Sequence, residues 1–161
     1  MKRSLLLIFL AAFLFAFSCQ QEEKRLLKLP TLFSDHMVLQ QDQNVSIWGE
    51  CTPNMEVNVR GSWGNEISTT SDANGHWKLE LPTPKAGGPY SLSIVTKDST
   101  AVFNDVLIGE VWLASGQSNM QMPLKGWPPN DLIQNSAVEI AEADHPEIRM
   151  FTVPMTLSLI P

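Results

Sequence analysis

Basic side chains and cysteines are scarce in this sequence of 161 residues. Lys and Arg together number 11 against 17 Asp and Glu, which gives a formal net charge of −6 with neutral histidines. Because so acidic a chain offers no basic stripe to a phosphate backbone, its composition disfavours nucleic-acid binding. The two cysteines, Cys19 and Cys51, are too few for a disulfide framework. We expect Cys51, at the end of a strand-like run, to be a small buried residue rather than a nucleophile.

The longest apolar run follows two basic residues at the N-terminus and extends from Leu5 to Phe17. It is shorter than the ~20 residues that span a bilayer, and it has the length of a signal-peptide core. Small residues one and three places before Cys19 resemble a bacterial lipobox. We therefore predict a lipoprotein signal peptide over residues 1–18, lipidation of Cys19 and a polar tether over residues 19–28. By resemblance to lipoprotein sorting rules, the glutamine after the cysteine favours an exported protein that is lipid-anchored at the outer membrane, on its periplasmic or surface face.

Residues 29–106 alternate between apolar and polar side chains, as half-buried strands do. Turn residues such as Asn74 and Gly75, which tolerate positive φ, separate the alternating segments. Several short strands at this spacing predict a β-sandwich domain over residues 29–106. Asp72 begins a plain hairpin turn rather than a calcium loop, because the later ligands are missing. The alternation places Trp77 in the core and His76 in water, and the predicted strands are Val45–Ile47, Met55–Val59, Trp77–Leu81 and Tyr90–Ile94.

The pattern changes after residue 106. Val106 to Ala114 is almost continuously apolar, which suits a buried strand of a parallel sheet. Ser136 and Glu139 have the spacing of a capping box at the start of a helix, and Ile148–Val153 indicates a second strand. This strand–loop–helix–strand order predicts the start of an α/β domain over residues 107–161.

Ser118 is the candidate nucleophile of this second part. It lies just beyond the first predicted strand, where the ligands of parallel sheets collect. Gly116 lets the chain turn sharply and lets an acyl group approach the backbone, and the Ser118 amide can donate to an oxyanion. Met120 stands where the Gly-x-Ser-x-Gly elbow of α/β-hydrolases has its second glycine, so the loop is not that elbow.

The block Gly109–Gln121, GEVWLASGQSNMQ, closely resembles the first conserved block of sialate O-acetylesterases, which are SGNH (GDSL-like) hydrolases. Phe33–Gln41 and Val45–Gly49 are similar to that family's β-domain, and Ile148–Val153 is similar to its second α/β strand. The resemblance implies that residue 107 begins a flavodoxin-like three-layer α/β domain of the SGNH type. It also implies a carbohydrate O-acetylesterase that acts on O-acetylated sialic acids or related sugars, with no metal or organic cofactor.

The same resemblance assigns residues to the site. Ser118 would take the acetyl group from a sugar hydroxyl and pass it to water, and Gly116, Gln117 and Asn119 would form the surrounding substrate and oxyanion region. The segment Trp127–Pro129 is either a wall of the substrate pocket or a rigid loop.

A serine nucleophile needs a base, and the base needs an acid that orients it. SGNH hydrolases take both from a late Asp-x-x-His block, which this sequence lacks. His145 is adjacent to Asp144, so we expect it to be a surface residue near the end of a helix. We therefore interpret residues 107–161 as a truncated start of the hydrolase domain. Two alternatives stay open: a surface lipoprotein whose β-sandwich binds glycans or acts as a spacer without catalysis, and a pseudogene product.

Overall fold

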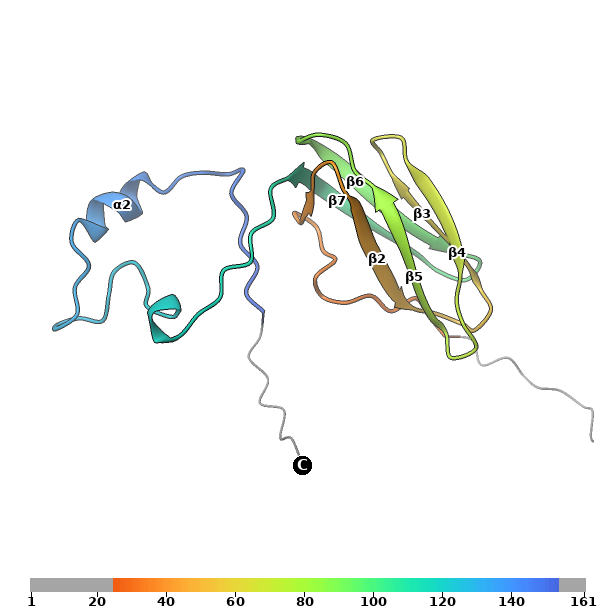
Figure 1. Cartoon of the computed structure of the whole chain (residues 1–161), viewed down its shortest axis with the longest axis horizontal. Coiled ribbons are helices and arrows are strands. Elements are labelled where there is room, and N and C mark those ends of the chain that lie inside the picture. The colour runs from red at the N-terminus through yellow and green to blue at the C-terminus, as the bar shows by residue number, and fades with distance from the viewer. Residues whose placement is uncertain (1–24, 154–161) are drawn as a thin grey trace, which may run out of the picture.

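The computed structural model describes residues 25–153, so the predicted signal peptide and Cys19 lie outside the described residues. The described chain is mostly β-sheet with one α-helix (Figure 1). A two-stranded antiparallel sheet pairs β2 (Asn44–Glu50) with β5 (His76–Pro82). The second sheet has five strands in the order β1-β7-β6-β3-β4, namely β1 (Val38–Gln40), β7 (Thr100–Gly109), β6 (Gly87–Thr96), β3 (Glu56–Gly61) and β4 (Glu66–Thr70).

The two sheets face each other across one hydrophobic core (Figure 1). Alternate residues of each strand point into this core, as the period of a pleated strand requires. Trp77 is buried and the neighbouring His76 is exposed, which confirms the two orientations predicted from the alternation. Cys51 is buried as a free thiol, also as predicted. The buried apolar residues are Phe33, Leu39, Ile47, Cys51, Val57, Val59, Trp77, Leu79, Leu81, Leu92, Ile94, Val106 and Ile108.

The segment before β1 extends the small sheet by one position. Lys28 forms an antiparallel bridge with Glu50, and the two residues exchange backbone hydrogen bonds of 2.8 and 2.9 Å. Gly49 permits this close approach, because a Cβ at that position would lie 2.7 Å from the Lys28 carbonyl oxygen and 2.8 Å from Leu29 Cδ2. Leu29 packs against the core as a result.

A tight turn joins β4 to β5 where the sequence predicted one. Asp72 Oδ1 accepts hydrogen bonds from the backbone N–H groups of His76 and Asn74, at 2.9 and 2.8 Å, and Gly75 has φ +89°. These bonds, that of His76 first, hold the pKa of the Asp72 carboxyl below its usual value. The turn is not a hairpin turn within one sheet, because it carries the chain from the five-stranded sheet to the two-stranded one.

The prediction of a strand over Val106–Ala114 is wrong in its position. β7 begins at Thr100 and ends at Gly109, three residues beyond the boundary predicted at residue 106. It pairs antiparallel with β6 and parallel with β1, so its apolar residues belong to the first core. Trp112 and Leu113 are 86% and 90% exposed, because no strand or helix among residues 25–153 packs against them. Ile148–Val153, which was also predicted to be a strand, forms none, because no strand among residues 25–153 pairs with it.

The predicted helix forms, but its predicted capping box does not. The α2 helix (Ser136–Glu142) is preceded by Asn135, which takes the cap position in a left-handed conformation with φ 59°. Asparagine tolerates that conformation better than most residues. Ser136 therefore becomes the first helical residue, and no side chain caps the helix. The α2 helix has no buried residue, because no other element among residues 25–153 packs against it.

Candidate active site

The chain leaves β7 through a set of side-chain hydrogen bonds centred on Glu110. Gln40 Nε2 donates to Glu110 Oε2 at 3.0 Å, and Gln41 Nε2 donates to Glu110 Oε1 at 2.6 Å. The Val111 amide donates to Gln40 Oε1 at 2.8 Å. The Gln40 bond, followed by that of Gln41, keeps the pKa of Glu110 below its usual value. Gln40, the last residue of β1, and Gln41, which follows it, thus hold Glu110 and Val111, the first two residues that lead from β7 toward Ser118.

Ser118 begins a single 3₁₀ turn, η1 (Ser118–Met120). The Met120 amide donates to the Gln117 carbonyl at 2.9 Å and the Gln121 amide donates to the Ser118 carbonyl at 3.0 Å, which closes the turn. The predicted site residues Gly116, Gln117, Ser118 and Asn119 are all exposed on this turn. A Cβ on Gly116 would lie 2.6 Å from Met120 Cγ, so a larger residue at this position would have to displace the Met120 side chain.

Within residues 25–153, the Ser118 hydroxyl makes no side-chain hydrogen bond and no histidine is bound to it. The three histidines of the sequence are engaged or placed elsewhere. His36 Nδ1 bonds Asp105 Oδ2 at 2.5 Å, and His76 lies 4.0 Å from Glu50. His145 lies after α2 beside Leu124, Glu139 and Glu142, and it is exposed as predicted. The described residues therefore present a candidate nucleophile without its base.

The segment around Trp127 forms a closed turn. Trp127 and Asp131 exchange backbone hydrogen bonds of 2.8 and 3.1 Å. Gly126, with φ +71°, precedes this turn, and Trp127 is partly exposed. These hydrogen bonds fit the rigid-loop interpretation of Trp127–Pro129.

A second contact returns the end of the described chain to the β-sheet part. The Arg149 guanidinium donates to both carboxylate oxygens of Asp105 at 2.9 Å, and it also bonds the Asp105 carbonyl oxygen. The His36 bond first, and the Arg149 bonds second, hold the pKa of Asp105 below its usual value. Asp105 lies on β7 and His36 precedes β1, so this network ties residues near 149 to the sheet edge.

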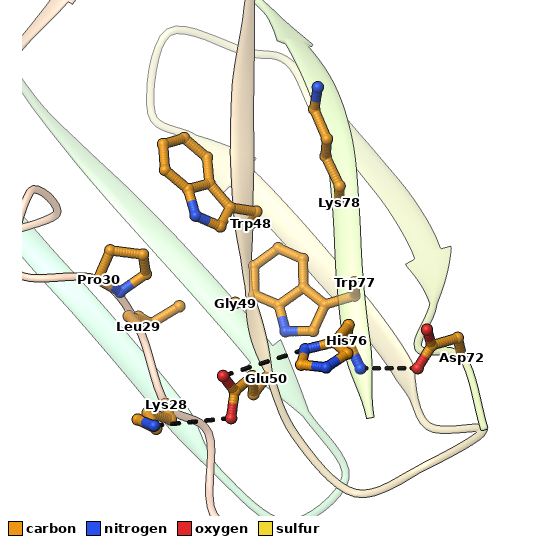
Figure 2. Close-up of a pocket in the computed structure, with 10 residues that line it drawn as sticks. All are labelled: Lys28, Leu29, Pro30, Trp48, Gly49, Glu50, Asp72, His76, Trp77 and Lys78. Atoms are coloured by element: carbon orange, nitrogen blue, oxygen red, sulfur yellow. Dashed lines mark hydrogen bonds and ion pairs between the residues drawn. The ribbon is translucent and has the colours of Figure 1, made fainter. Parts of the chain in front are cut away.

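A groove lies elsewhere in residues 25–153, on the small sheet (Figure 2). It has a volume of about 570 Å³ and runs over Trp48, Glu50 and His76. This surface is not predicted from the sequence. Its one available signal is Trp48, a large aromatic residue at an outward position of β2, where the alternation calls for a polar side chain.

No cluster of three or more His, Cys, Asp or Glu side chains that could hold a metal ion occurs in the part of the chain that the structure describes. Four residues of the hydrogen-bond networks described above are not predicted from the sequence, namely Gln40, Gln41, Asp105 and Arg149. Their spacing gives no local signal, because the hydrogen-bonded partners are 44 to 71 positions apart in the sequence.

No protein-family model matches this chain. It is 31% identical over 142 residues to a mouse protein named sialate O-acetylesterase, a match that covers 81% of this chain and 25% of the mouse protein. The human protein of the same name is 33% identical over 105 residues, covering 59% of this chain and 20% of that protein. The chain thus spans about a quarter of the length of the curated relatives that it matches.

A solved structure is also similar to this chain. The carbohydrate acetylesterase from Xanthomonas citri superposes with a TM-score of 0.58 and 42% identity, over 62% of this chain and 23% of that chain. The proteins that this chain resembles, in sequence and in structure, are therefore esterases named for carbohydrate substrates. Together they support a sialate O-acetylesterase-like family for this chain, and they confirm the resemblance carried by Gly109–Gln121.

Proposed function

We propose that this chain is the first part of a serine-dependent carbohydrate O-acetylesterase that removes acetyl groups from O-acetylated sialic acids or related sugars. The observation that carries the proposal is the similarity to the mouse sialate O-acetylesterase. Because that match covers 81% of the 161 residues, it includes Ser118 wherever it begins. The exposed turn at Ser118 supports the same assignment, since a nucleophile must be open to its substrate.

The proposal includes an architecture. Residues 29–106, together with the rest of β7 to Gly109, form a β-sandwich, and the chain after Gly109 begins an α/β domain of the SGNH type. The two facing sheets with one shared core support the first part. The order of η1 and α2 after β7, together with the exposed apolar side chains of Trp112 and Leu113, supports the second. Side chains of this kind are usually covered in a complete domain.

In the proposed reaction, Ser118 Oγ bonds to the acetyl carbonyl carbon and gives its proton to a base. The bond between that carbon and the sugar oxygen then breaks, and the sugar leaves as an alcohol after taking up a proton. Water attacks the acetylated serine in the same manner, which releases acetate and restores Ser118. The Ser118 amide is a candidate donor to the oxyanion, with Gly116, Gln117 and Asn119 around it.

The base is the part of the mechanism that residues 25–153 do not place beside Ser118. The resemblance to SGNH hydrolases assigns it to a late Asp-x-x-His block. We propose that such a block belongs to the region of the relatives that this chain does not match, which is about three quarters of their length. A histidine oriented by a carboxylate would then complete the arrangement that a serine nucleophile needs.

The test is acetate release from O-acetylated N-acetylneuraminic acid by the protein expressed from its complete gene. Ser118→Ala should lower kcat by about 10⁶-fold, the order of loss seen when the catalytic serine of a serine protease is removed. Ser115→Ala is the matched control, because Ser115 lies in the same exposed segment and has no assigned role. Equal turnover by wild type and Ser118→Ala would overturn the proposal, whereas equal loss in both variants would indicate a damaged loop.

We also propose that the protein is exported as a lipoprotein, with Cys19 as the lipidated first residue and an outer-membrane location. Support comes from the sequence alone, namely the apolar run that ends just before Cys19. A lipid anchor would hold the esterase at the membrane. Of the predicted tether over residues 19–28, Arg25 and Lys28 are bonded to the β-sheet part, so only the residues before Arg25 would separate that part from the membrane.

A further inference from the structure

The outer face of the small sheet carries two rows of side chains that form one groove (Figure 2). In the first row, Lys28, Glu50 and His76 lie side by side, because Lys28 bridges Glu50 and Glu50 is paired with His76. In the second row, Trp48 is paired with Lys78. Residues opposite each other in an antiparallel pair share a face, and rows two residues apart are separated by ~7 Å.

Trp48 forms an aromatic wall of this groove. Its side chain is 38% exposed, although it is the largest side chain on β2. Phe33 holds the indole in place with an edge-to-face contact, at 5.0 Å between ring centroids and an interplanar angle of 73°. A ring fixed in this way offers a flat apolar surface without losing side-chain entropy on binding.

The row beside Trp48 has unused hydrogen-bonding capacity. Glu50 lies 3.7 Å from Lys28 and 4.0 Å from His76, which are ion-pair separations without hydrogen bonds. The side chains of Lys28 and Glu50 are 77% and 48% exposed. A carboxylate, an ammonium group and an imidazole therefore face the groove with donors and acceptors available to a ligand.

We infer that this groove binds a pyranose unit of a glycan, with one face of the sugar ring against Trp48 and its hydroxyls bonded to Glu50, Lys28 and His76. A sugar matches the groove because it has an apolar C–H face and a polar rim of hydroxyls, as the groove has an aromatic wall and a polar row. The site is separate from Ser118, which lies beyond β7 in the other part of the chain. The choice of a glycan rests on the proposed function.

The groove's own chemistry disfavours the other classes of occupant. Both signs of charge alternate along the polar row, so it has no uniform field for a phosphate backbone. The described residues of the groove contain no set of three ligands that could hold a metal ion. The volume of about 570 Å³ falls within the range of small-ligand sites and leaves room for a short oligosaccharide.

The experiment is saturation-transfer NMR on the full chain with sialyllactose as the probe. Wild type should transfer saturation to the ring protons of the sugar, and Trp48→Ala should weaken binding about fivefold or more, since an aromatic contact is removed. Glu50→Gln tests the polar row with an intact tryptophan, and it should weaken binding to a similar degree. Trp48→Phe keeps an aromatic ring and should retain most of the binding, which separates loss of the contact from loss of the fold.

Two control variants locate the bound sugar. Trp112→Ala removes an equally large exposed indole outside the groove and should bind sialyllactose as wild type does. Ser118→Ala should also bind normally, because the groove is independent of the nucleophile. The inference is overturned if wild type shows no transfer, if Trp48→Ala and Glu50→Gln both bind normally, or if Ser118→Ala abolishes binding. A dimer that dissociates in Trp48→Ala would instead assign the groove to a second copy of the chain.

The readouts keep the two proposals apart. Loss of acetate release in Ser118→Ala with unchanged sialyllactose binding supports both of them. Binding at the groove by a protein that releases no acetate would leave the groove standing and overturn the esterase. If acetate release depends on Ser118 but sialyllactose does not bind at Trp48, the esterase proposal stands and the proposed groove site is overturned.

Discussion

The guanidinium of Arg149 contacts both carboxylate oxygens of Asp105 at 2.9 Å, across 44 positions of sequence. The Arg149 side chain is 19% exposed and the Asp105 side chain is 38% exposed, so this pair is partly buried. Asp105 also accepts a bond from His36, which brings together residues from before β1, within β7 and near the end of the described chain. The network holds residues near 149 against the edge of the five-stranded sheet at a point where α2 and its neighbours make few other contacts.

The first prediction concerns acid. The pKa of Asp105 is held below its usual value by His36 first and Arg149 second, so the carboxylate stabilises the fold when ionised. That stabilisation is present above the unfolded pKa of about 3.9 and is lost as the pH falls through the lower folded value. Asp105→Asn should therefore lower the Tm at pH 7 and reduce the further fall between pH 5 and pH 2.5.

Thermal unfolding of both proteins at pH 7, pH 5 and pH 2.5 checks this prediction. Asp144→Asn, at an exposed position after α2, is the control and should follow wild type. A fall in Tm on acidification that is as large in Asp105→Asn as in wild type would show that the network does not respond to this carboxyl group.

The second prediction concerns Gly49. A Cβ there would lie 2.7 Å from a backbone oxygen and 2.8 Å from Leu29, so Gly49→Ala must push the segment that contains Lys28 and Leu29 away from β2. Overpacking of this kind costs about 1–3 kcal/mol, which corresponds to about 4–8 °C in Tm per kcal/mol for a domain of this size. Gly109→Ala is the control, because its nearest neighbour would be Val38 Cγ1 at an ordinary 3.9 Å. Equal melting of the two variants would contradict the close approach at Gly49.

The third prediction concerns the turn at Ser118 and rests on the proposed function. A Cβ on Gly116 would clash with Met120 Cγ, so Gly116→Ala should displace the nucleophile and lower kcat by about 10²-fold, with less effect on KM. Shortening the clashing side chain should restore the loop. The double variant Gly116→Ala/Met120→Ala should recover most of the lost kcat, and a double variant as slow as Gly116→Ala would exclude this clash as the cause.

The fourth prediction concerns the anchor. In cells fed radioactive palmitate, wild type should incorporate the label and sediment with membranes. Cys19→Ser should lose the label and shift to the soluble fraction, since a stable anchor requires covalent acyl chains. Cys51→Ser is the matched control, because Cys51 is buried and free and should not affect labelling. Labelling that survives in Cys19→Ser would exclude Cys19 as the lipidated residue.

Much of the β-sheet part could be predicted from the sequence, because its information is local. The alternation around Trp77 fixed which residues are buried, and the turn at Asp72 followed from residues that bond their own backbone. The predicted bounds of the last strand were wrong, because an apolar run does not show which of its residues will find a partner strand. Val106–Ala114 is apolar enough for a buried strand, yet β7 takes only the part that can pair with β6 and β1 and leaves Trp112 exposed.

The sequence by itself determined the elements that depend on short-range preferences: the strand faces, the tight turns, the helix over α2 and the motif around Ser118. The tertiary structure decided how the chain is held together over long distances. Only folding brings Gln40 and Gln41 to Glu110, Arg149 to Asp105, and Lys28 beside Glu50 and His76. Hydrogen bonds and ion pairs between such distant residues leave no periodic trace in the sequence, because their geometry is set by the register of the sheets rather than by spacing along the chain.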